Sequence, residues 1–492
     1  MRGYILPLAI GGTMAAASTA ALAAGEWKPV ERDPSVKEVP FDSDLFKADP
    51  EYDITYDPEA QIEIYGGKKP VDNPKPPVEI GRGLYDPGEI GDGIPFFGDK
   101  NRLFPAFSVF GDLRSAVAFN DNGDDEVAII AAAANLNFNL ELTGTERIHM
   151  FWQPVDDVTG FEFAGDDRSD GVANLQEEPT TLFFEGDLGA IWTGISDEYT
   201  SWDMPIAFGR VPLLFQNGVW FNDAFLGAAV TIPAQNSPAL DITNFDITFF
   251  AGWDEITSNA FTDNNGNAAD HEADMYGVAG FFDVAEGYLE VGYAYLLDTD
   301  KQSGGDQSYH NITAAFSKRY FGKIANATRI IGNFGQDKGA NGQRTANGFL
   351  LISENAFITP SITLIPHANF FIGKDTPQKV AGNNNLQQVG LNFETDALTG
   401  FPKLNDTGAD AIGGAVGIQY LFGLEQQVVA EIAGQVPWDD KEGIQEAEMG
   451  FQIRYQRPLN NRLIFRADAM YGLRFGGLND LSGARVELRV KL

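Results

Sequence analysis

The sequence contains no cysteine among its 492 residues, and it has only four histidines. The lack of cysteine excludes disulfide bonds, thiolate metal sites, lipoprotein attachment and covalent attachment of haem. Four histidines in a chain of this length argue against a histidine-rich metal centre. The composition therefore predicts a protein with no cofactor and no resident metal ion.

Positive charge is also scarce. The chain has 34 lysines and arginines against 70 aspartates and glutamates, which gives a formal net charge of −36. Nucleic acid binding depends on neutralising phosphates with cationic side chains, so we exclude nucleic acid as a natural partner. Such acidity keeps a protein surface hydrated, but it does not specify a fold.

A membrane-spanning helix needs about 20 apolar residues, and no run of this kind follows the N-terminal segment. The sequence therefore predicts no membrane-spanning helix there. The N-terminus itself begins with Met1 and Arg2, continues with an apolar and small-residue run over residues 4–17, and offers Ala21, Leu22 and Ala23 as an A-x-A cleavage site. These features predict a signal peptide over residues 1–23. The mature chain is then either soluble outside the inner membrane or a membrane barrel.

The last 47 residues alternate apolar and polar side chains in three consecutive segments. The apolar members of the third segment are Ala484, Val486, Leu488, Val490 and Leu492. Side chains of a strand point alternately to opposite faces, so each segment has one apolar and one charged face. An exported chain with strands of this kind is predicted to be a barrel.

From residue 104 onward the sequence divides into eighteen strand candidates. Short links such as residues 144–146 and 285–286 alternate with long polar links such as 155–181, 255–273 and 373–410. Tight turns at one end and long loops at the other are typical of outer-membrane barrels. Two links, 194–205 and 233–244, are longer than this rule prefers. We therefore predict an all-β, antiparallel, up-and-down transmembrane barrel of 16 to 18 strands over residues 104–492.

Residues 24–103 are acidic and rich in proline, and Pro70, Pro74, Pro76 and Pro77 favour an extended path. We predict a periplasmic leader for this segment. It is either solvated without fixed structure, or it folds into the barrel mouth or contacts a periplasmic partner.

These features together resemble the porins of the outer membrane of Gram-negative bacteria. The residues 140–147 and 208–212 resemble the strand-turn-strand texture of porin channels, whereas the final Leu492 departs from the usual C-terminal aromatic residue. The resemblance implies a location in the outer membrane, contact with its lipid and lipopolysaccharide, and transport of small hydrophilic solutes. It also implies a homotrimer, although one sequence gives no interface.

The polar face of the last three segments is predicted to line the pore, because the apolar face must meet lipid. The pore-lining candidates are Arg454, Arg462, Arg466, Asp468, Arg474, Arg485, Glu487, Arg489 and Lys491. A wall of arginine and lysine favours anions. Alternatively, these arginines pair with acidic residues of an inward loop or of the leader, as is common in porin lumens.

We find no catalytic residues. The sequence contains no G-x-S-x-G motif, and His149 and His367 are predicted to face the lumen as polar lining. The segments 120–126 and 263–267 have the composition of calcium loops, but Ala118 and Phe261 occupy the first-ligand positions, so we predict solvated turns. The sequence therefore predicts a passive channel. The alternative is a scaffold barrel that sheathes a partner such as a periplasmic cytochrome, or a surface receptor.

Overall fold

The computed structural model describes residues 75–81, 92–95, 98–155, 160–165, 175–254, 256–262, 273–299, 301, 305–339, 342–361, 363–394, 397–422, 425–438 and 446–492. The predicted signal peptide and most of the leader lie outside the described residues. Within the described ranges, no helix is long and apolar enough to cross a membrane.

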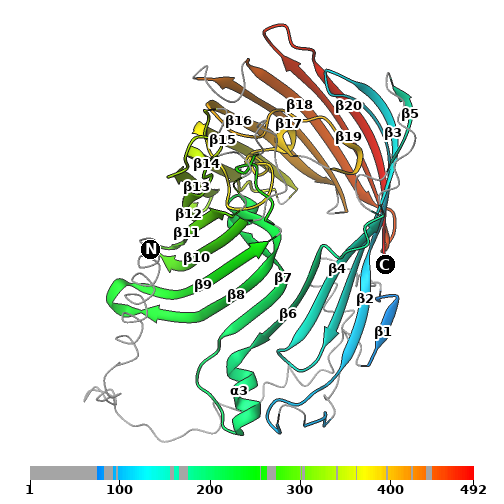
Figure 1. Ribbon diagram of the computed structural model, residues 1–492. Coiled ribbons are helices and arrows are strands. Elements are labelled where there is room, and N and C mark those ends of the chain that lie inside the picture. The colour runs from blue at the N-terminus through cyan, green and yellow to red at the C-terminus, as the bar shows by residue number, and fades with distance from the viewer. Residues whose placement is uncertain are drawn as a thin grey trace, which may run out of the picture. The chain divides into compact units, whose positions relative to one another are not determined.

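Alternating polar and apolar residues produce the strands of one large sheet (Figure 1). Its first strands are β1 (Val78–Ile80), β2 (Ala106–Asp121), β3 (Glu126–Glu141), β4 (Arg147–Val155), β5 (Gly160–Gly165), β6 (Thr181–Asp187) and β7 (Pro205–Phe215). The middle strands are β8 (Phe221–Ser237), β9 (Ile242–Asp254), β10 (Ala273–Val284), β11 (Gly287–Asp298), β12 (Tyr309–Tyr320), β13 (Ile324–Phe334) and β14 (Asn347–Phe357). The last are β15 (Leu364–Thr376), β16 (Ala411–Phe422), β17 (Gln426–Pro437), β18 (Glu448–Pro458), β19 (Leu463–Arg474) and β20 (Leu481–Lys491).

The sheet closes on itself. From β6 to β20 each strand pairs with the next in antiparallel fashion, and β20 pairs with β2 with Arg485 opposite Ala118. Strands β4 and β5 share one position, because β3 pairs with β4 near Leu136 and with β5 near Ala131. With β1 as a short addition, the wall has eighteen antiparallel positions, which confirms the predicted barrel and its upper strand number. Closure leaves no free sheet edge in hydrocarbon.

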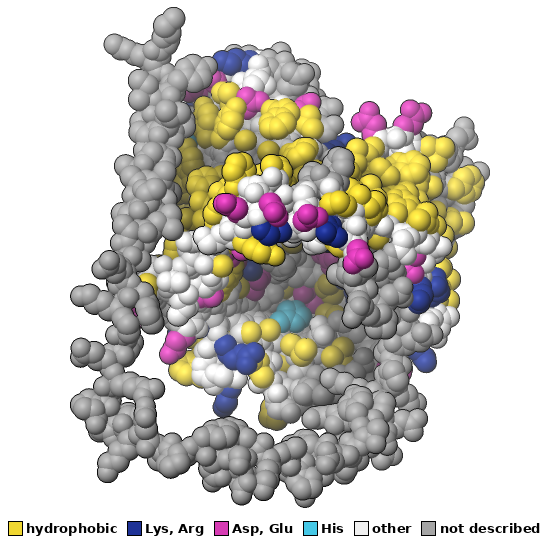
Figure 2. Space-filling view, turned by 90° about the horizontal axis from the view of Figure 1, so that it is seen from below, with side chains coloured by type: hydrophobic (Ala, Val, Ile, Leu, Met, Phe, Trp, Pro, Cys, Tyr) yellow, Lys and Arg dark blue, Asp and Glu magenta, His cyan; other side chains and the backbone are white. Residues whose placement is uncertain are grey.

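The two faces of the wall differ as alternation predicts. In β20, Val486 and Leu488 are exposed, whereas Arg485 and Glu487 are buried at 2% exposure each. Figure 2 shows a broad area of hydrophobic side chains on the outer side of the wall, around a hollow at one end of the barrel. The outer face suits lipid, and the inner face holds the charges.

One local prediction is wrong. Residues 182–193 are one of the eighteen strand candidates, but they do not form one strand, because β6 ends at Asp187 and the helix α3 (Leu188–Ser196) follows. The Asp187 carboxylate caps α3 by accepting a hydrogen bond from the Ala190 N–H, so this acidic residue starts a helix instead of continuing the strand. The turn predicted at residues 120–126 is confirmed, because β2 and β3 pair up to Asp121 and Glu126 and leave residues 122–125 as a tight hairpin turn.

The short single-turn 3₁₀ helices lie in the connections. They are η3 (Gln216–Gly218), η4 (Pro238–Leu240), η5 (Leu391–Phe393) and η6 (Ala397–Thr399). The link predicted over 233–244 is therefore mostly a long β8–β9 hairpin with η4 at its tip. The other long link, 194–205, holds the end of α3.

Part of the leader joins the barrel wall. Strand β1 pairs with β2, with Val78 opposite Val109 and Ile80 opposite Phe107. Strand β20 pairs with β2 only from Asp112 upward, and the Leu492 N–H donates to the Gly111 carbonyl. Strand β1 thus continues the wall where β20 stops. We call the end of the barrel where β2 begins and β20 finishes the terminal end.

Candidate functional site

Residues 377–410, which connect β15 to β16, fold into the lumen. The Lys379 ammonium donates to the Gly218 carbonyl at 2.8 Å, the Asn392 N–H donates to Glu431 of β17 at 3.0 Å, and Asn120 of β2 donates to the Thr399 carbonyl. One segment can touch these separate parts of a closed wall only from inside. The sequence placed this long link outside the barrel, so its position is a correction. We call residues 377–410 the inward loop.

The inward loop is held by an apolar core inside the barrel. Its side chains Val380, Leu386, Val389 and Phe393 are fully buried. They belong to one cluster with Trp220, whose indole N–H donates to Asn311 Oδ1 at 2.8 Å. Burial of these four apolar side chains stabilises the inward loop in its position inside the barrel. The sequence signal was weak, because these apolar residues are scattered singly in a polar stretch.

Trp220 packs closely against β11 because Gly292 leaves room for it. A side chain at Gly292 would place its first carbon 2.3 Å from the Trp220 ring. The ring also packs near Phe215 and Phe250, with centroid distances of 5.7 Å and 6.0 Å. An apolar layer therefore covers this part of the inner wall, opposite the charged strands described next.

Asp468 of β19 is the centre of an arginine cluster. Its carboxylate, with a side chain at 0% exposure, accepts from Arg454 at 2.7 Å, from Arg466 at 2.8 Å and from Arg485 at 2.8 Å. Arg454 also contacts Glu394 of the inward loop at 3.0 Å. Charge-assisted bonds of this kind are strong and specific. The cluster therefore fixes the arginines and ties the inward loop to the wall.

A second ion pair extends the charged wall to β2. Arg114 donates to both carboxylate oxygens of Glu487, at 2.8 Å and 3.0 Å. Arg489 lies 3.6 Å from Glu487 and 3.8 Å from Asp112, with its side chain 36% exposed. Arg114 was not among the predicted pore residues, although it lies in a predicted strand.

The structure separates the predicted pore residues into two groups. Six of them come together on β18, β19 and β20: Arg454, Arg466, Asp468, Arg485, Glu487 and Arg489. The other three lie apart. Arg462 donates to the Lys75 carbonyl, Arg474 donates to the Asn479 carbonyl, and Lys491 is exposed beside the C-terminus.

Within the described part of the chain, the ion pairs of this wall join five arginines, at 114, 454, 466, 485 and 489, to four carboxylates, at 112, 394, 468 and 487. These described groups differ by one positive charge. The predicted alternative pairs the arginines with acidic residues of an inward loop or of the leader. The pair of Arg454 with Glu394 is of this kind, whereas the other three carboxylates belong to the wall itself.

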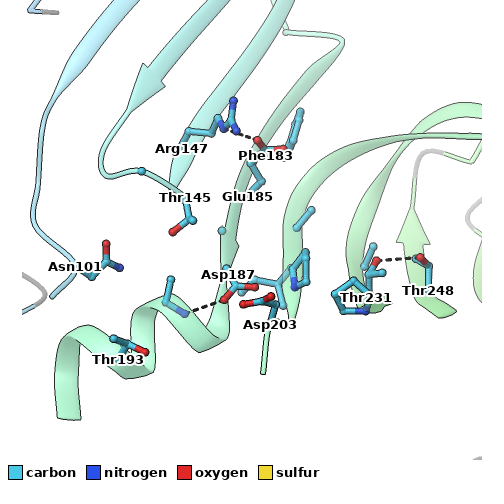
Figure 3. Close-up of a pocket in the computed structure, with 18 of the residues that line it drawn as sticks. Asn101, Thr145, Arg147, Phe183, Glu185, Asp187, Thr193, Asp203, Thr231 and Thr248 are labelled. Carbon is cyan, nitrogen blue, oxygen red and sulfur yellow. Dashed lines mark hydrogen bonds and ion pairs between the residues drawn. The ribbon is translucent and has the colours of Figure 1, made fainter. Parts of the chain in front are cut away.

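A cavity of 1140 Å³ opens at the terminal end of the barrel (Figure 3). Arg147 and Glu185, 2.6 Å apart, lie on one side of it, and Thr231 and Thr248, 2.9 Å apart, lie on the other. Asp187 at the start of α3 faces the same space. The lining of the cavity is mixed, because these polar groups lie beside apolar side chains such as Phe183 and Leu213.

Both lumenal histidines have carboxylate neighbours. His149 Nε2 lies 3.4 Å from Glu185 and its ring stacks on Phe183 at 5.3 Å. His367 Nε2 lies 3.1 Å from Glu431, the residue that also holds Asn392 of the inward loop. The prediction that both histidines face the lumen is confirmed.

Lys379 gives a prediction about pH. Its side chain is 2% exposed, and burial lowers the pKa of its ammonium from 10.5 to about 8. Between these values the unfolded chain binds more protons, so the free energy of unfolding should rise with pH from about 8 to 10. Lys379→Met should remove this rise, and the exposed Lys301→Met should keep it. Urea unfolding at pH 7, 9 and 10 measures the effect, and an equal pH slope in Lys379→Met would contradict it.

We compared the chain with protein families, curated proteins and solved structures. No family model and no curated protein matches the sequence. Solved structures do match. Pseudomonas aeruginosa OccK11 (OpdR) shows a TM-score of 0.50 at 12% identity, over 78% of this chain and 96% of that chain. The P. aeruginosa OpdK structure with vanillate shows 0.51 at 14% identity, over 78% and 98%. The barrel fold of this chain is therefore similar to the fold of these two proteins.

The same fold appears in the P. aeruginosa outer membrane protein opdK, with a TM-score of 0.50 at 12% identity, over 78% of this chain and 98% of that chain. The part of this chain that these structures cover is close to the length of residues 104–492. The predicted resemblance to porin-type barrels is therefore confirmed at the level of the fold.

Proposed function

We propose that this protein is a channel in the outer membrane of a Gram-negative bacterium that lets small hydrophilic solutes diffuse passively. The observation that carries the proposal is the inward loop, which crosses the lumen. It lies beside the arginine cluster around Asp468 and the Arg114–Glu487 ion pair, which together we call the arginine wall. A barrel of eighteen strands is wide enough for an aqueous channel, and a loop folded into it narrows the path. Selection then depends on width and charge, without a chemical step.

The arginine wall favours small organic anions. The Arg454 and Arg466 side chains are about 15% exposed and Arg489 is 36% exposed, whereas Arg485 is fully buried. A solute can therefore approach the first three, while Arg485 acts by holding Asp468. Guanidinium groups suit carboxylates in a bidentate geometry. Vanillate, the molecule present in the OpdK structure, is a small carboxylate of this kind.

Planar-bilayer recordings test the proposal. The purified protein should give steady single-channel steps, and its reversal potential in a KCl gradient should shift toward cations when Arg466 or Arg489 is changed to glutamine. Arg485→Ala should shift it too, by disturbing Asp468. Arg462→Gln is the matched control, because Arg462 lies at the terminal end outside the cluster. A cation preference that Arg466→Ala and Arg485→Ala leave unchanged would end the anion hypothesis.

The inward loop also favours a channel over a sheath. In a scaffold barrel a partner polypeptide, such as a cytochrome, would fill the lumen. Here the chain's own loop takes that position and buries its apolar side chains there. Co-purification of a cytochrome with a silent barrel would favour the sheath instead.

A further inference from the structure

Four polar side chains lie together on the outer face of β13 and β14. Asn326 pairs across the strands with Asn355, and Thr328 pairs with Ser353. We call these four residues the outer polar patch. Their direction follows from alternation, since the intervening Arg329 is buried in the barrel, where it pairs with Glu354.

The patch lies within the apolar part of the outer wall. On the same face, Ile330 follows it along β13 and Phe357 follows it along β14 toward the opposite end, and both are exposed. On the neighbouring strands, Phe370 pairs with Ser353 and Val416 lies one strand further, also exposed. Apolar residues thus border the patch above, below and to one side. Lipid is a poor neighbour for carboxamides in such a place.

The four side chains bond to one another. Asn326 Nδ2 donates to Ser353 Oγ at 3.2 Å and to Asn355 Oδ1 at 2.8 Å, and Thr328 Oγ1 donates to Asn326 Oδ1 at 3.2 Å. Asn355 Nδ2 donates to Ser353 Oγ at 3.3 Å and to the Ala368 carbonyl at 2.9 Å. Each carboxamide oxygen has two lone pairs, and these bonds use one at each asparagine. The patch keeps acceptor capacity that hydrocarbon cannot satisfy.

We propose that the outer polar patch is the contact surface between two copies of this chain, related by a two-fold axis along the membrane normal. Copies inserted in the same direction can meet patch to patch only around such an axis. Carboxamides and hydroxyls both donate and accept, so the patch complements itself. Polar side chains bond protein segments together in lipid, and small neighbours such as Ala314 and Ala368 allow close approach. This contact differs from the trimer that the porin resemblance implied.

Cysteine cross-linking tests the contact, because the chain has no cysteine of its own. Ser353→Cys, near the axis, should give a disulfide-linked species of twice the mass in lipid vesicles under mild oxidation. Ile453→Cys is the matched control, since Ile453 is exposed on the outer face of β18. It should stay monomeric. A Ser353→Cys chain that stays monomeric, or an Ile453→Cys chain that cross-links equally, would overturn the proposal.

A second variant separates assembly from folding. Asn326→Leu combined with Asn355→Leu should abolish the dimer in lysine-reactive cross-linking. It should keep the heat-dependent change in gel mobility that marks a closed barrel, and it should keep the single-channel conductance. If this variant still cross-links as a dimer, the patch is not the contact. Because conductance is read separately, failure of this proposal is distinguishable from failure of the proposed channel function.

Discussion

Replacing residues 378–408 with a short glycine-serine linker should raise the single-channel conductance severalfold, on the order of three times. The inward loop spans the lumen between the apolar layer around Trp220 and the arginine cluster around Asp468. Its removal would leave a lumen bounded only by the wall. A short linker can join the remaining ends, because the Asp375 N–H donates to Asp410 Oδ1 at 2.7 Å across the base of the loop. Planar-bilayer recording measures the change.

A control variant shows that shortening a connection is not itself the cause. The turn Asn122–Asp125 between β2 and β3 lies at the rim, so replacing it with Asn-Gly should leave conductance unchanged. Heat-dependent gel mobility shows that each barrel is closed. If the variant without the inward loop conducts like the parent, the loop does not obstruct the path, and the proposed selection by width fails.

Asp468→Asn should lower the free energy of unfolding by about 3–5 kcal/mol and shift the reversal potential toward anions. The Asp468 carboxylate is the partner of three arginines, and one of them, Arg485, is fully buried. Loss of its charge would leave these cations in a low-dielectric setting with one carboxylate fewer. The described ion pairs of the wall would then carry one more net positive charge than in the parent. Urea unfolding in vesicles and recordings in a KCl gradient measure the two effects.

Matched variants make this result specific. Asp124→Asn removes the same charge from an exposed turn and should change stability by less than about 0.5 kcal/mol. Asp468→Asn combined with Arg466→Gln should regain part of the lost stability, because one cation fewer then lies close to Arg454 and Arg485. If Asp468→Asn is as stable as the parent, the cluster is solvated and does not hold the wall together.

The strands could be predicted from the sequence because each had to satisfy one local rule. Lipid on one side and water or charge on the other impose a period of two, and β16 to β20 follow it almost without exception. The closed barrel then followed from the needs of the backbone in hydrocarbon. The same rule predicted that His149 and His367 face the lumen.

The inward loop could not be predicted in this way, because its position depends on long-range packing. Val380 and Phe393 carry no periodic signal, and the partners that bury them lie on distant strands. The strand prediction at 188–193 failed for a local reason. In the sequence, the helix-capping Asp187 cannot be distinguished from a polar residue within a strand. Arg114 was missed because its partner, Glu487, lies 373 positions away.

Strand β1 has a consequence for the order of assembly. Its pairing with β2 joins Val78 to Val109 and needs only the first part of the chain, whereas closure of β2 on β20 joins residues as far apart as Arg114 and Glu487. Loop-closure entropy favours the nearer contact first. Strand β1 would then already occupy the wall below Gly111 when β20 arrives. Strand β1 would therefore block β20 from shifting its register toward the terminal end. A shift by one residue would turn Arg485 outward into lipid.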